Sequence, residues 1–116
     1  MLHFEPDTDL IAQVLTELSA PLAPGSFLAV THATHDPLPE HQRRRLRAEL
    51  NNTDRPRHHL PRTRHELHTI LDGLGLQPDG DGLVSTIGWR PDLHPGPGDG
   101  VGEADAIGYA CVARRP

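Results

Sequence analysis

A short apolar run in the first third of the chain constrains the fold more than any other feature. Residues 26–31 read Ser-Phe-Leu-Ala-Val-Thr, so apolar side chains fall on both faces of the strand that they would form. A strand that is apolar on both faces is typical of a sheet covered by helices on each side. The run therefore predicts a buried strand in an α/β fold.

The segment before this strand has the periodicity of an amphipathic helix. Pro6 and Asp7 favour a helix start, and Pro21 and Pro24 would stop it. Between these points apolar residues recur at helical spacing, at Leu10, Ile11, Val14, Leu15 and Leu18. We therefore predict a helix that packs this stripe against the sheet.

A weaker helix is expected over residues 38–51, in which Leu46 and Leu50 share one face. Arginines are spread around the rest of its surface, at Arg43, Arg44, Arg45 and Arg47. Two interpretations of these arginines stay open. They form a solvated face, or they bind an anionic ligand.

The spacing of Thr63 and Glu66 predicts the start of a third helix. A hydroxyl and a carboxylate three residues apart form a capping box, in which each side chain accepts from a backbone donor at the helix start. The apolar stripe that follows comprises Leu67, Ile70, Leu71 and Leu74. Gly73 and Gly75 are expected to end this helix in the left-handed conformation.

Two strands are expected in the last third of the chain, at residues 83–89 and 107–113. A Gly- and Pro-rich surface loop at about 91–102 joins them. Residues 1–4 look like the end of a further strand whose beginning is absent. Helices and strands then alternate as in an open α/β sheet. We predict one domain over residues 1–116, with three helices and about three strands plus the stub.

Composition limits the partners that such a domain can have. Of 116 residues, only 35% are hydrophobic and 23 are Gly or Pro (11 and 12), so the core should be thin. A net charge of -5 disfavours nucleic acid, and no apolar run is long enough to span a membrane. Cys111, the single cysteine, has no partner for an internal disulfide. We expect a cytoplasmic protein.

Three stretches match a known family in order and spacing. They are residues 2–7, residues 24–34, and the segment from Arg62-Thr63-Arg64 to Trp89-Arg90-Pro91-Asp92. Together they resemble a family of S-adenosylmethionine (SAM)-dependent methyltransferase-like proteins of GC-rich bacteria, long catalogued as a domain of unknown function. The resemblance implies the carboxyl-terminal half of a class I, Rossmann-like methyltransferase sheet, in which residues 26–31 correspond to the fifth strand.

The resemblance also implies a cofactor, SAM, whose usual binding elements are missing from this chain. No Gly-x-Gly-x-x-Gly turn follows any expected strand, and the first strands and the acidic residue that holds the ribose have no counterpart. Cofactor-binding residues therefore stay unassigned. We expect a partial methyltransferase that binds SAM weakly or not at all when alone.

Ligands of open α/β sheets bind outside the carboxyl ends of the strands, so we expect the site there. Methyl transfer is an in-line displacement in which the protein aligns two reactants and sometimes removes a proton. The residues that follow the expected strands are candidates for these roles: His3 and His32 as the base, and Phe4, Asp7, Thr31, Trp89 and Arg90 around a small-molecule acceptor. Alternatively, the two imidazoles only hydrogen-bond loop backbone, and Trp89 only fills the core.

Two other functions compete with this one. A half-domain with an exposed sheet edge could act as a binding or assembly module, closing its sheet against a second copy or another partner. The nine histidines suggest a metal-binding protein as a weaker alternative. However, the stretch His65-Glu66-Leu67-His68 is one residue short of the metalloprotease motif, and no zinc-type spacing occurs. We therefore predict no metal site.

Overall fold

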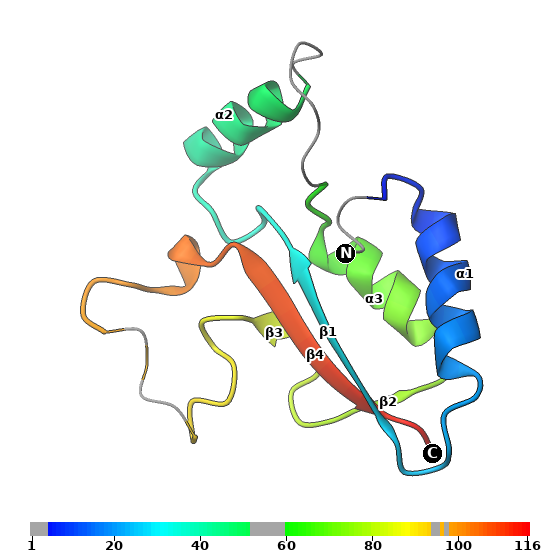
Figure 1. The fold of residues 1–116 in the computed structure, drawn as a ribbon. Helices are drawn as coiled ribbons and strands as arrows, with labels where there is room; N and C mark the ends of the chain where they lie inside the picture. Colours follow the sequence, from blue (N-terminus) through cyan, green and yellow to red (C-terminus); the bar gives the residue numbers. More distant parts are fainter. Residues whose placement is uncertain (1–4, 52–59, 94–95, 97) are drawn as a thin grey trace.

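The computed structural model describes residues 5–51, 60–93, 96 and 98–116, and within them an α/β fold (Figure 1). Its elements, in chain order, are α1 (Thr8–Ser19), β1 (Phe27–Ala33), α2 (Glu40–Leu50), α3 (Arg64–Asp72), β2 (Gln77–Pro78), β3 (Val84–Ser85), the short 3-10 helix η2 (Glu103–Asp105) and β4 (Gly108–Arg114). The α/β class and the three predicted helices are confirmed. The predicted strand stub at residues 1–4 lies outside the described residues.

The sheet is organised around its last strand, β4. The strand order is β1-β4-β2, with β3 also paired to β4, and every one of these pairings is antiparallel. Because β1 and β3 both run opposite to β4, they run in the same direction on its two sides. Their carboxyl ends therefore meet at one edge of the sheet, as the expected site requires.

The strand predicted at residues 83–89 is much shorter than expected. Only Val84 and Ser85 pair with β4, while Gln77 and Pro78 form a separate short strand that the sequence did not suggest. Gly80 and Gly82 both adopt positive φ between these two segments, at 62° and 71°. A side chain is disfavoured in that conformation, so the glycines allow the turn that joins β2 to β3.

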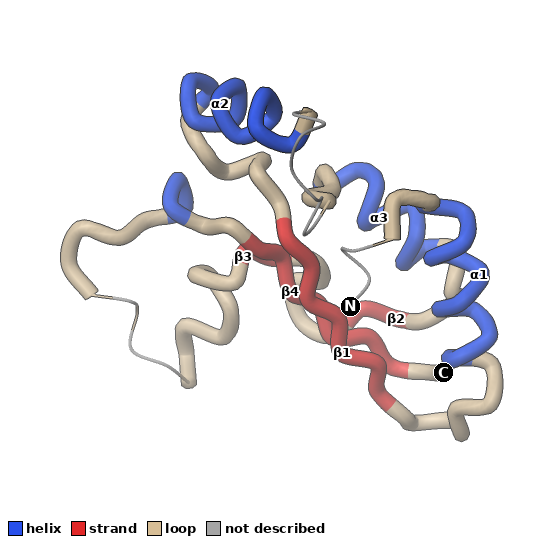
Figure 2. Tube along the Cα trace, turned by 45° about the horizontal axis from the view of Figure 1, so that its top comes forward, coloured by secondary structure: helices blue, strands red, loops and turns tan. Residues whose placement is uncertain are grey.

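The prediction that β1 is buried on both faces is wrong. Exposed and half-buried residues alternate along it, Phe27 is 57% exposed, and His32 is its only buried residue. The reason is that helices cover only one face of the sheet, since α1 and α3 lie together on the same side of it (Figure 2). Among the described residues no helix covers the opposite face, to which Phe27, Ala29 and Thr31 belong by alternation.

The caps of α1 and α3 form as their sequences predict. The Asp7 carboxylate accepts from the backbone N–H groups of Asp9 and Leu10, at 3.0 and 3.1 Å. The capping box is also confirmed, since Thr63 N donates to Glu66 Oε2 at 2.7 Å and Glu66 N donates to Thr63 Oγ1 at 3.2 Å. These bonds satisfy donors that a helix start leaves without intrahelical partners.

The predicted end of α3 is only half correct. Gly75 takes the left-handed conformation, with φ at 65°, but Gly73 is right-handed, with φ at -66°. The left-handed residue therefore comes two residues after Gly73 rather than at Gly73 itself.

The core is thin and centres on α3. One cluster joins α3 to the sheet through Leu67, Leu83, Tyr109 and Cys111. The other cluster joins α3 to α1 through Ile70, Ile11 and Leu15. Helix α3 therefore contacts both the sheet and α1, and its buried side chains hold the layers together.

Truncating Leu67 should therefore destabilise the whole domain. Leu67 is 4% exposed, and Leu67→Ala should lower the free energy of unfolding by about 2–5 kcal/mol, because it leaves a cavity beside Tyr109 and Cys111. Leu18→Ala is the matched control, because Leu18 is 59% exposed and should cost less than about 1 kcal/mol. Urea unfolding followed by circular dichroism measures both. Equal losses in the two variants would contradict this description of the core.

Candidate functional site

The ends of β1 and β3 meet beside the start of β4. His32 pairs with Tyr109, and Ser85 pairs with the same residue from the other side. Thr31 and Trp89 line one cavity of about 310 Å³ at this edge, together with Ala29, Val30, Thr86, Ala110, Cys111 and Val112. Two of the predicted substrate residues are thus brought together on the sheet face that no described helix covers.

Trp89 does not fill the core, because it is only partly buried and belongs to neither core cluster. Hydrogen bonds of the Ser85 side chain stabilise the turn that carries Trp89. Ser85 Oγ donates to Glu103 Oε1 at 2.7 Å and accepts from Gly88 N at 3.0 Å. A Cβ on Gly88 would lie 2.9 Å from that Glu103 oxygen, so a larger residue here would displace the Glu103 carboxylate. Ser85 and Glu103 were not among the site residues predicted from the sequence.

Arg90 lies next to Trp89 and is held by Asp92. Its Nε donates to Asp92 Oδ1 at 3.0 Å and its Nη2 donates to Oδ2 at 2.9 Å. This bidentate carboxylate contact raises the pKa of the exposed Arg90 guanidinium. An acceptor that uses Arg90 would therefore compete with Asp92 for it. Both residues also line a second cavity with Trp89, Asp79 and Asp81.

His32 is buried, and both nitrogens of its ring have partners. Its Nδ1 lies 2.8 Å from Ala33 O, and its Nε2 lies 3.0 Å from Arg62 Nη1. A carbonyl only accepts and a guanidinium only donates, so Nδ1 carries the proton and Nε2 accepts. To act as a base, His32 would have to release the bond from Arg62.

Arg62 is the central residue of this buried network, although the sequence named it only within a family stretch and assigned it no role. It is 2% exposed, and burial lowers the pKa of its guanidinium. Its Nη2 donates to Glu5 O, its Nε contacts Thr8 Oγ1 at 3.4 Å, and its backbone N–H donates to Ala33 O at 3.1 Å. One residue thereby joins the start of α1, the end of β1 and the start of α3.

The remaining predicted site residues are not all placed. Asp7 is exposed and caps α1, while His3 and Phe4 lie outside the described residues. Cys111 is buried in the core, and burial raises the pKa of its thiol, which disfavours the reactive thiolate. Cys111 is therefore an inert buried thiol rather than a nucleophile.

Neither a metal site nor a membrane helix is found in the described part of the chain. No three His, Cys, Asp or Glu side chains gather there closely enough to hold a metal ion. None of its helices has the length and apolar character that crossing a bilayer requires.

The arrangement of these elements is that of a methyltransferase fold, as comparison with solved structures shows. A DUF574-family protein from Streptomyces avermitilis superposes with a TM-score of 0.75 at 28% identity, over 100% of this chain and 42% of its own. A protein from Thermobifida fusca, provisionally described as a methyltransferase, superposes with a TM-score of 0.69 at 28% identity, over 99% of this chain and 40% of its own. No curated protein matches the chain.

The family follows from a match over the whole sequence. The model of the S-adenosyl methyltransferase family matches residues 1–116, so this chain belongs to that family. The resemblance predicted from the sequence is thereby confirmed. The chain spans about two fifths of the solved structures that it matches, at 42% and 40%.

Replacing Arg62 should destabilise the domain far more than replacing an exposed arginine. Arg62→Met removes the donor that reaches His32 Nε2 and Glu5 O, so the free energy of unfolding should fall by about 3 kcal/mol. Arg45→Met is the control, because its side chain is 83% exposed. Thermal and urea unfolding measure both variants. A loss in Arg62→Met no greater than in Arg45→Met would show that the network does not hold these elements together.

Proposed function

We propose that this chain supplies the acceptor side of a SAM-dependent methyltransferase and depends on further sequence for the cofactor. The observation that carries the proposal is the shared cavity of Thr31 and Trp89, at the edge where β1 and β3 end. Ligands of open α/β sheets bind at such edges. Membership of the methyltransferase family supports methyl transfer as the chemistry.

The lining of this cavity favours an acceptor with a flat apolar part. Trp89 offers an aromatic face, the β-strands contribute small apolar residues, and Thr31 and Thr86 offer hydroxyls. Asp7 at the start of α1 and Arg90 beside Trp89 are the further polar groups that we assign to the acceptor side. His32 is proposed as a positioning residue, because its Nε2 already accepts from Arg62.

The cofactor half is proposed to come from outside these 116 residues. The sequence contains no Gly-x-Gly-x-x-Gly turn, and the matching structures are more than twice as long as the part matched. In class I sheets that turn places backbone N–H groups against the cofactor. The chain alone should therefore bind SAM or its product weakly or not at all.

Calorimetric titration with S-adenosylhomocysteine tests both halves of the proposal. The chain alone should give no saturable heat up to about 1 mM ligand, which corresponds to less than about 4 kcal/mol of binding free energy. A chimera in which this chain replaces the matched part of the Thermobifida fusca protein should bind one ligand per chain. The intact Thermobifida fusca protein is the positive control.

Two results would overturn the proposal. Micromolar binding by the chain alone would mean that the missing turn is not needed. Failure of the folded chimera to bind, while the intact protein binds, would mean that this chain cannot complete a methyltransferase site.

An assembly module is the second candidate, and the free edge of β1 favours it. Within the described residues β1 pairs only with β4, so its other edge presents backbone groups without a strand partner. Phe27, 57% exposed, lies on the same strand. An open edge beside apolar side chains is a template for pairing with another chain, such as a second copy.

Replacing Ala29 by proline would block such pairing. Ser26 O accepts from Arg115 N and Thr34 N donates to Ile107 O, both on the β4 side, so by alternation the N–H of Ala29 points to the free edge. If two copies pair through this edge, Ala29→Pro should convert a dimer to a monomer. Ala29→Val keeps the N–H and should leave the dimer intact. Light scattering after size exclusion measures the mass, and a wild-type monomer would exclude self-assembly.

A further inference from the structure

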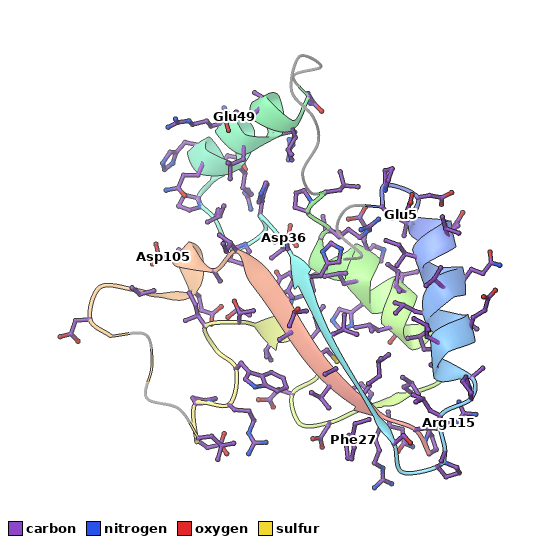
Figure 3. All side chains as sticks on the ribbon, viewed as in Figure 1. Glu5, Phe27, Asp36, Glu49, Asp105 and Arg115 are labelled. Atoms are coloured by element: carbon purple, nitrogen blue, oxygen red, sulfur yellow. The ribbon has the colours of Figure 1, made fainter. Side chains whose placement is uncertain are left out.

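A third cavity, away from Trp89, lies between α2 and the segment that leads into α3. It has a volume of about 260 Å³ and is formed by the loop after β1, by α2 and by residues 60–63. Asp36, one of its lining residues, lies between the end of β1 and α2 (Figure 3). We infer that this cavity binds the carboxylate of a small ligand with an apolar body. Binding at this site does not depend on the proposed methyl transfer.

Helix α2 directs two of its arginines to the cavity. Arg43 and Arg47 are four residues apart, hence on one face of the helix, and both line the cavity with Leu50. Arg44 and Arg45 do not line it, and their side chains are 76% and 83% exposed. The predicted arginine cluster therefore divides into an outer pair and a cavity pair.

The carboxylates of α2 pair with Arg43 of the cavity pair as well as with the outer arginines, Arg44 and Arg45. Glu40 is shared by Arg43 and Arg44, at 2.5 and 3.1 Å, and Glu49 lies 3.7 Å from Arg45. No ion pair or hydrogen bond to the Arg47 side chain occurs within the described residues. Arg47 is thus a fixed-charge donor at the cavity wall, available to an incoming anion.

The other charged groups of the cavity favour an anion over a cation. Its lining holds Arg43, Arg47 and Arg62 against a single carboxylate, Asp36. That carboxylate is already engaged, because Asp36 Oδ2 accepts from Arg64 N at the start of α3, at 2.7 Å. Asp36 O also accepts from Arg43 Nη1 at 3.0 Å, which orients this guanidinium beside Arg47.

The remaining lining residues indicate that the rest of the ligand is apolar. Leu50, Leu60 and Pro61 are apolar, and Leu50 is half-buried. A cavity slightly below the usual 300 Å³ of ligand pockets suits a compact molecule of about ten heavy atoms. A small aromatic or branched aliphatic monocarboxylate combines both requirements, whereas a nucleotide or a peptide would exceed the space.

Titration of the ¹⁵N-labelled chain with sodium benzoate at constant ionic strength tests the inference. The shifts should saturate and should be largest at the backbone amides that line the cavity: Leu50, Asn51, Leu60 and Thr63. Arg47→Gln should weaken benzoate binding about tenfold, because it removes one charge-assisted contact. Arg45→Gln, on the outer face of the same helix, should leave the affinity unchanged.

Benzamide serves as a neutral probe of the same shape and should bind about tenfold more weakly than benzoate. Both variants replace exposed side chains, so a dispersed spectrum will confirm that each is folded. The inference is overturned if benzoate shifts do not saturate, if they centre on the Trp89 cavity, or if Arg47→Gln and Arg45→Gln bind benzoate equally well.

Discussion

The pairing of three strands with β4 is the constraint on which the described structure depends. β1 pairs with it along all seven residues, and the short strands β2 and β3 pair with it on the other side. Neither β2 nor β3, at two residues each, would persist without this neighbour. Because β1 and β3 thereby run the same way, their ends lie at one edge, and the proposed acceptor site is a consequence of that pairing.

The second constraint is that the sheet is covered on one side only. α3 packs on the sheet and α1 packs on α3, so both core clusters lie on one side of the sheet. The buried Arg62, just before α3, contacts Thr8 of α1 and His32 of β1, and so connects both helices to the end of β1. On the opposite face Phe27 and Thr31 remain exposed. This open face is the surface that a cofactor-bearing segment, or a second copy, would have to complete.

The cavity beside Trp89 and the cavity beside α2 differ in the side chains that they offer to a ligand. The one at Trp89 is bounded by strand backbone and small apolar side chains, whereas the one beside α2 is bounded by arginines. They are separated by the end of β1, where His32 and Arg62 form the buried network. Arg62 lines the α2 cavity and His32 follows Thr31 of the Trp89 cavity, and breaking the bond between them would leave a buried group unsatisfied.

Local signals in the sequence determined the helices, their caps and the family. Asp7 and the Thr63–Glu66 box act within one helical turn, and the family match needs only order and spacing. Tertiary structure alone decided the burial of β1 and the two short strands β2 and β3. It also decided the role of Arg62, which the sequence alone does not distinguish from a surface arginine. The physical reason is range: caps and periodicity arise from neighbours a few residues away, whereas burial and the partners of Arg62, 54 and 30 residues distant, exist only after the chain has folded.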